Sequence, residues 1–178
     1  LLAISIAIWA VFPSVPVYII PIPAVAILLT IFMDSKVSLL YSLLIVIMLS
    51  ISLQYRVEAI AVFTIGTMIA TFTSTMIKYY RRIDLLKAGF DVGLVQVLVV
   101  LCTFLLQSNL ENIDLNADII DVSSSFFNGL ISSIIALGTL PLIESAFKIA
   151  TPYGLTELTD PSQALLKRLQ FEAPGTYH

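Results

Sequence analysis

Long apolar runs restrict the fold of this chain more than any other feature of its sequence. Hydrophobic residues make up 58% of the 178 residues and charged residues only 12%, and the mean hydropathy is +1.00. Soluble domains are about half apolar and about a quarter charged, so a water-facing globule could not hide this much apolar surface. The sequence therefore predicts a polytopic membrane protein of the all-α class, built as a bundle of transmembrane helices.

Three further features narrow the class of protein. The formal net charge is −3 and no basic cluster belongs to a common solvent-facing domain, so nucleic acid is not an expected partner. Cys102 is the single cysteine, which excludes an intramolecular disulfide. The chain begins on Leu1 with no Met and no basic region, so no cleavable signal peptide is visible, and we expect that an upstream segment has been removed.

Six apolar segments are candidates for membrane spans, each of which needs roughly 17–25 mostly apolar residues. They cover residues 1–12, 17–33, 37–53, 57–77, 85–106 and 123–150. The first is too short alone and looks truncated at its start. The second carries Pro21 and Pro23 near its beginning, so we expect an irregular segment that becomes helical after Pro23. Residues 1–152 are thus predicted to form the bundle.

The positions of the basic residues predict the orientation of the bundle. With six spans, eight of the nine cations lie in loops on one side, and Arg56 alone lies on the other. The eight are Lys36, Lys78, Arg81, Arg82, Lys87, Lys148, Lys167 and Arg168. The positive-inside rule makes that side cytoplasmic, so both ends of this chain are expected inside. The outer loop 107–122 carries four acidic residues and no cation.

Residues 153–178 are predicted to form a cytosolic connector after the last span. Asp160 followed by Pro161 is typical of a helix N-cap with Pro at the first helical position. A short helix is expected from about residue 164 to 171, ended by Pro174 and Gly175. A signal could shift the bundle between two packings that present this connector helix, counted from Asp160, differently.

Two charged residues near the end of the sixth span form a candidate pair. Glu144 and Lys148 have the i,i+4 spacing that pairs side chains on one face of a helix. We interpret them as a structural ion pair at the membrane interface. The alternatives are a pair that handles ions or protons, or a lever that transmits a signal.

Small residues recur every four positions in two spans. One stripe is Gly66, Ala70 and Ser74, and the other is Ser125, Gly129 and Ser133. Such stripes let helix backbones approach closely in lipid, so we interpret them as packing surfaces and not as a ligand pocket. Asn128 lies beside the second stripe, and its amide needs a partner from a neighbouring helix or a bound signal.

The chain contains no recognisable catalytic set. A metal-dependent hydrolase needs several His and Asp ligands, whereas His178 is the single histidine. No catalytic, cofactor-binding or metal-binding residue is therefore assigned. A transporter or channel would place Asn128, Glu144 and the broken second span along a substrate path, but central charges and an inverted repeat are not visible. An intramembrane enzyme would need Glu58, Asp91 and Glu144 to share one site, and their places near opposite membrane faces speak against it.

The end of the chain carries the sharpest family signature. Leu165-Leu166, Lys167-Arg168 and the run from Glu172 to His178, Glu-Ala-Pro-Gly-Thr-Tyr-His, follow one another in order. The segments 84–89, 137–144 and 151–152 add weaker signatures upstream. Together they resemble the bacterial seven-transmembrane receptors with an HD hydrolase domain, in which an extracellular domain precedes the membrane helices and the HD domain comes after them.

This resemblance implies a function for the intact protein. It would be a phosphodiesterase of the bacterial cell membrane that hydrolyses cyclic di-AMP with divalent transition metals, Mn or Fe, bound in a cytoplasmic HD domain. The present chain would hold six of the seven helices, anchor the enzyme and relay a signal, with Asn128, Glu144, Lys148, Asp160 and Pro161 as candidates for relay or helix packing. Its partners would be the lipid bilayer and the two flanking domains, and the resemblance leaves a homodimer open.

Overall fold

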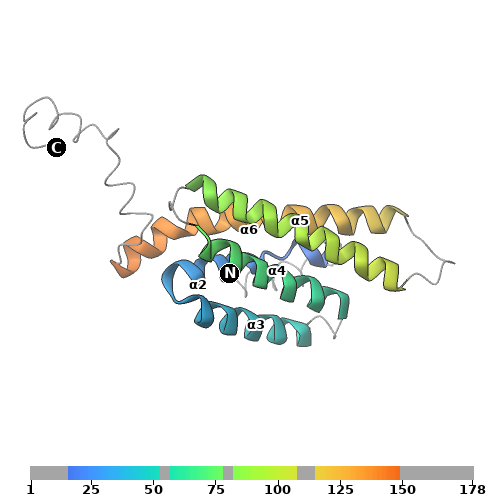
Figure 1. The fold of residues 1–178 in the computed structure, drawn as a ribbon, viewed down its shortest axis with the longest axis horizontal. Coiled ribbons are helices and arrows are strands. Elements are labelled where there is room, and N and C mark those ends of the chain that lie inside the picture. Colours follow the sequence, from blue (N-terminus) through green and yellow to red (C-terminus); the bar gives the residue numbers. More distant parts are fainter. Residues whose placement is uncertain (1–15, 53–56, 78–81, 108–114, 149–178) are drawn as a thin grey trace, which may run out of the picture.

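The computed structural model describes residues 16–52, 57–77, 82–107 and 115–148, and these form helices without any strand (Figure 1). The elements are the 3-10 helix η1 (Val17–Ile19) and the α-helices α2 (Ile22–Phe32), α3 (Ser35–Ser52), α4 (Val57–Thr75), α5 (Arg82–Gln107) and α6 (Leu115–Phe147). The predicted all-α class is confirmed. The predicted first span, 1–12, and the connector, 153–178, lie outside the described residues.

Three of the helices are long and apolar enough to cross a membrane. They cover Val57–Thr75, Arg82–Leu106 and Asp118–Phe147, whereas Val17–Phe32 and Ser35–Ile51 are shorter apolar helices. The structure therefore supports a multi-pass membrane protein, and the number of six spans stays a prediction.

The helices pack as an antiparallel bundle with α2 on the inside. The contact between α5 and α6 is the most extensive, followed by that between α4 and α5. α2 contacts α3, α4 and α6. The turn between α2 and α3 consists of Met33 and Asp34. Beside it, Ser38 Oγ lies 3.0 Å from the Ala26 carbonyl oxygen and 2.8 Å from Thr30 Oγ1, which ties the two helices together.

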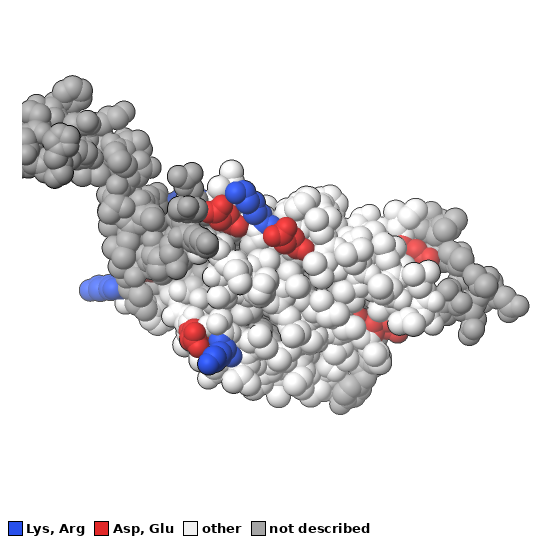
Figure 2. Space-filling view, in the orientation of Figure 1, with Lys and Arg blue, Asp and Glu red and all other residues white. Residues whose placement is uncertain are grey.

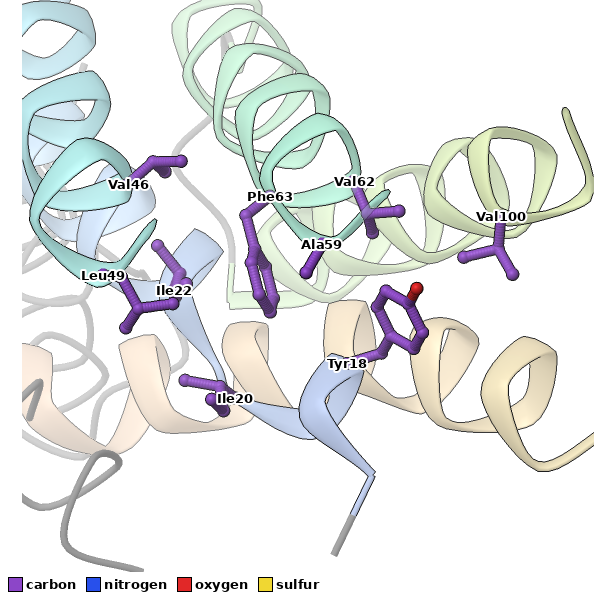
Figure 3. Packing of buried hydrophobic residues seen from close by; sticks show 9 residues of the cluster. All are labelled: Tyr18, Ile20, Ile22, Val46, Leu49, Ala59, Val62, Phe63 and Val100. Carbon is purple, nitrogen blue, oxygen red and sulfur yellow. The ribbon is translucent and has the colours of Figure 1, made fainter. Parts of the chain in front are cut away.

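The second apolar segment has the predicted irregular start, but its helix begins at Ile22 and not after Pro23. η1 ends at Ile19, Ile20 is extended, and α2 begins at Ile22 with Pro23 in its first turn. Proline has no N–H, so a continuous helix through Pro21 would lose a backbone hydrogen bond. Tyr18, Ile20 and Ile22 are buried around the break and meet side chains from α3, α4 and α5 (Figure 3). The break is therefore packed with apolar side chains.

α6 differs from its predicted bounds at both ends. It begins at Leu115 and not near residue 123, and it ends at Phe147 and not at Ala150. Asp118 lies in its first turn, where a carboxylate stabilises the partial positive charge of a helix N-terminus. Part of the predicted outer loop is thus helix. Pro141 lies inside α6 and leaves the Leu137 carbonyl without its N–H partner, a common cause of a helix bend.

The described cations share one end of the bundle. Lys36 begins α3, Arg82 and Lys87 belong to the first turns of α5, and Lys148 comes directly after α6. Because helices that follow one another in the chain run antiparallel, these four positions lie at the same end. On the face shown in Figure 2, basic side chains gather toward that end, and a wide uncharged surface separates them from acidic residues at the other. This is the charge distribution that the positive-inside rule requires.

Candidate functional site: a buried polar layer between α4, α5 and α6

Glycines bring the backbones of α5 and α6 into direct contact. A methyl group on Gly93 would come within 2.6 Å of the Phe126 carbonyl oxygen, and one on Gly89 within 2.7 Å of the Gly129 carbonyl oxygen. A methyl group on Gly129 would meet the backbone of both Gly89 and Gly93. The stripe that contains Gly129 is therefore a packing surface, as its spacing indicates.

Gln96 is the polar residue that this packing buries most completely on α5. Its side chain is 0% exposed and lies over Gly66 of α4, where an added methyl group would come within 3.0 Å of the Gln96 amide carbon. Neither amide atom of Gln96 has a hydrogen-bond partner among the described residues. An amide in this position is costly, since lipid and apolar side chains offer no replacement for water.

Asn128 is a second buried amide, on the facing surface of α6. It is 0% exposed, and its Oδ1 accepts a hydrogen bond of 3.1 Å from Ser132 Oγ, one turn along the same helix. Its Nδ2 has no partner within the described part of the chain. The sequence predicts a partner from a neighbouring helix or a bound signal. Among the described residues, Ser132 of the same helix satisfies the carbonyl half of the amide, and a partner for Nδ2 from a neighbouring helix or a bound signal stays a prediction.

The two amides lie at neighbouring levels of the bundle. Gly129, next to Asn128, contacts Gly93, and Gly93 precedes Gln96 by less than one helical turn. Buried hydroxyl groups surround them, but most bond to carbonyl oxygens of their own helices. Thr67 donates to Thr64, Thr71 to Thr67, Ser125 to Val122 and Ser133 to Leu130, over 2.8–3.0 Å. The unused hydrogen-bonding capacity of this layer therefore resides mainly in Gln96 and in Asn128 Nδ2.

Gln96 was not among the residues selected from the sequence, although one feature of the sequence marks it. It interrupts the apolar residues of α5 near the middle of that helix, where a polar side chain is expensive in a membrane. Asn128 was singled out because it stands beside a small-residue stripe. Gln96 has no such stripe on its own helix beside it, since the glycine that accommodates it, Gly66, belongs to α4.

The other predicted candidates do not join this layer. Glu144 is half-buried in the last turn of α6, whereas Lys148 is exposed after the helix end with a φ of 53°. Lys148 is therefore not on the same helical face as Glu144, because the helix ends before it. A role for the pair stays a prediction. Asp160 and Pro161 lie outside the described residues.

The unpartnered amide atoms of Gln96 and Asn128 are hydrogen-bonding groups of this layer. Within residues 16–52, 57–77, 82–107 and 115–148, no three His, Cys, Asp or Glu side chains are grouped so that they could hold a metal ion. Glu58 lies in the first turn of α4, and Asp91 lies toward the opposite end of the bundle.

Comparisons with known proteins relate the chain to one family. Residues 1–151 match the family described as a 7TM receptor with intracellular HD hydrolase. The cyclic-di-AMP phosphodiesterase PgpH of Bacillus subtilis is 28% identical over 166 residues, which cover 90% of this chain and 23% of the relative. The protein of the same name from Listeria monocytogenes is 31% identical over 148 residues, or 78% of this chain and 20% of the relative.

A third relative is an uncharacterized protein of Synechocystis, 32% identical over 137 residues, which cover 72% of this chain and 15% of that protein. The chain thus spans about a fifth of the length of the curated relatives that it matches. No solved structure matches it.

Proposed function

Because the chain belongs to the family of 7TM receptors with an intracellular HD hydrolase, we propose that it is the membrane-embedded receptor region of a cyclic-di-AMP phosphodiesterase. The family match over residues 1–151 carries the proposal. Two relatives that bear the name of this activity align with 78% and 90% of the chain. In this proposal the chain anchors the enzyme in the membrane and passes a signal to an HD domain in the same protein.

The catalytic chemistry would reside in that HD domain. Divalent transition metals, Mn or Fe, would lower the pKa of a bound water molecule and stabilise charge on the phosphate. The described residues of the present chain have no metal-ligand group, so their contribution is structural and regulatory. The proposal also counts six of the seven family helices in this chain, with the cation-rich end of the bundle and the connector facing the cytoplasm.

The polar layer between α4, α5 and α6 supports a relay role. Buried amides without full hydrogen bonding destabilise the packing around them, which lowers the free-energy gap to an alternative packing. A shift between two packings of α5 against α6 would move the end of α6, which leads to the connector that contains Asp160 and Pro161. A signal that favours one packing would thereby change how the HD domain is presented.

Hydrolysis by the intact protein tests the proposed function. The intact protein, reconstituted in lipid nanodiscs with Mn²⁺, is expected to convert cyclic di-AMP to a linear dinucleotide and to lose this activity when a chelator removes the metal. Cyclic di-GMP, with the same ring of two phosphodiesters, serves as the matched substrate control and is expected to react more slowly. An intact protein that cleaves neither dinucleotide, or that instead carries solute flux across proteoliposomes, would contradict the proposal.

A further inference from the structure

A groove of about 470 Å³ lies between the end of α4 and the beginning of α5, away from the buried polar layer. Its α4 side includes the apolar side chains of Phe72, Met76 and Ile77, and its α5 side carries Asp84, Lys87 and Asp91. Phe72 and Met76 are 59% and 60% exposed. The groove thus has exposed apolar side chains on its α4 side and charged side chains on its α5 side.

The charges of the groove are arranged on one face of α5. Asp84, Lys87 and Asp91 are spaced i, i+3 and i+7, which places them above one another on the helix. Lys87 Nζ lies 3.1 Å from Asp84 Oδ1, and the two side chains are 70% and 20% exposed. The exposed carboxylate of Asp91 has no hydrogen-bond or ion-pair partner among the described side chains. Among the described lining residues, two carboxylates and one ammonium give an excess of negative charge.

The groove lies along the first three turns of α5, near one end of a helix that is long enough to cross a membrane. α5 has 26 residues, which at about 1.5 Å per residue is longer than a hydrocarbon core of about 30 Å. If this excess length lies at the cation-rich end, the first turns of α5, from Arg82 to Lys87, reach the headgroup region. Helical side chains tilt toward the N-terminus, so the carboxylate of Asp91 is directed toward that region as well. Phe72 and Met76 supply the adjoining apolar surface.

From this geometry we propose that the groove binds a phospholipid whose headgroup carries a primary ammonium, as in phosphatidylethanolamine. The ammonium donates hydrogen bonds to the unpaired carboxylate of Asp91. The phosphate accepts from Lys87, whose ammonium has three N–H donors and shares one with Asp84. An acyl chain lies along Phe72 and Met76. Phosphatidylcholine has no ammonium N–H and could not donate a hydrogen bond to Asp91. Phosphatidylglycerol has no cation, so its phosphate would leave a net negative charge beside Asp84 and Asp91.

Lipid retention by the intact protein tests this site. The protein is reconstituted with equal amounts of phosphatidylethanolamine, phosphatidylcholine and phosphatidylglycerol of identical acyl chains, then extracted in mild detergent, and retained lipids are counted by native mass spectrometry. The wild type is expected to retain phosphatidylethanolamine several-fold over the other two. Asp91→Asn is expected to abolish this enrichment, and Lys87→Gln to reduce it.

Asp34→Asn is the matched control. Asp34 is an exposed carboxylate in the α2–α3 turn at the same end of the bundle, outside the groove, and Asn replaces Asp well at a helix start. This variant is expected to keep the wild-type enrichment. Equal retention of the three lipids by the wild type, enrichment of phosphatidylglycerol, or unchanged enrichment in Asp91→Asn would each overturn the proposal. The outcome is independent of the hydrolysis assay, because retention is measured without substrate.

Discussion

At the scale of single residues, Gln96 and Asn128 place carboxamides inside a bundle whose outer surface is largely apolar. Both are 0% exposed, and three of their four side-chain polar atoms have no partner among the described residues. Removing an uncompensated amide can stabilise a protein, because an apolar side chain of the same shape carries no desolvation penalty. If such a residue is kept despite its cost, a functional role is the natural hypothesis.

Gln96→Met tests this cost, since Met has a similar shape and neither amide atom. We expect the substitution to raise the free energy of unfolding by about 1–3 kcal/mol, the penalty of an unsatisfied buried polar group, measured by thermal denaturation in detergent. The same variant of the intact protein is expected to hydrolyse cyclic di-AMP at a changed rate, because the packing equilibrium is altered. Leu98→Met, on the same helix but 60% exposed, should change neither quantity. A lower melting temperature for Gln96→Met would mean that the amide has a polar partner in the membrane.

At the scale of the helices, contact between α5 and α6 depends on the absence of side chains. Gly129 faces the backbone of Gly89 and Gly93, whereas Gly138, about two and a half turns further along α6, has nothing within 4 Å of an added methyl group. Without a hydrophobic driving force between helices in lipid, such backbone contact is a main source of association. Gly129 therefore allows close contact with α5, whereas Gly138 makes no close contact that an added methyl group would disturb.

Gly129→Ala and Gly138→Ala form a matched pair that separates these purposes. Gly129→Ala is expected to destabilise the bundle by about 1–3 kcal/mol, because the methyl group forces α5 and α6 apart. Gly138→Ala is expected to stabilise it by up to about 1 kcal/mol through higher helix propensity. Thermal denaturation of both variants under the same conditions measures the difference. Equal melting temperatures would contradict the close packing of α5 on α6.

At the scale of the whole molecule, the distribution of charge links the fold to the direction of signalling. Lys36, Arg82, Lys87 and Lys148 meet at one end of the bundle, and Glu58 and Asp118 lie at the other. If the cation-rich end is cytoplasmic, the end of α6 points toward the proposed HD domain, and the start of α6 toward the outside. The orientation thus decides which end of the bundle can receive an external signal.

Cysteine labelling in intact bacteria measures this orientation. In a Cys102→Ser background, a membrane-impermeant maleimide is expected to label Asp118→Cys from outside the cell and to leave Lys36→Cys unlabelled. Lysed cells provide the control, in which both variants should react. Labelling of Lys36→Cys in intact cells, with protection of Asp118→Cys, would reverse the proposed topology.

Local physical rules explain which parts of the fold could be predicted from the sequence. The length of the apolar runs favoured helices, and Pro21 favoured a break before α2, because proline has no backbone N–H to continue a helix through it. Pro23 lies in the first turn of α2, where a helix tolerates proline. The predicted bounds of α6 were less accurate. The residues from Leu115 to Asp121 are polar enough to resemble a loop, yet they form helix beyond the apolar segment.

Composition, the order of apolar segments and the terminal motif were sufficient to identify a helical membrane protein of a known receptor family, and to predict eight of its nine cations on one side. Helix packing in three dimensions was needed to show that Gln96 of α5 is buried over Gly66 of α4, and that Gly129 lies against Gly89 and Gly93. It was also needed to show that Asp91 borders a groove between α4 and α5. This division arises because local sequence specifies which face of a helix is small or polar, whereas the rotation and offset of two helices depend on packing between residues far apart in the chain.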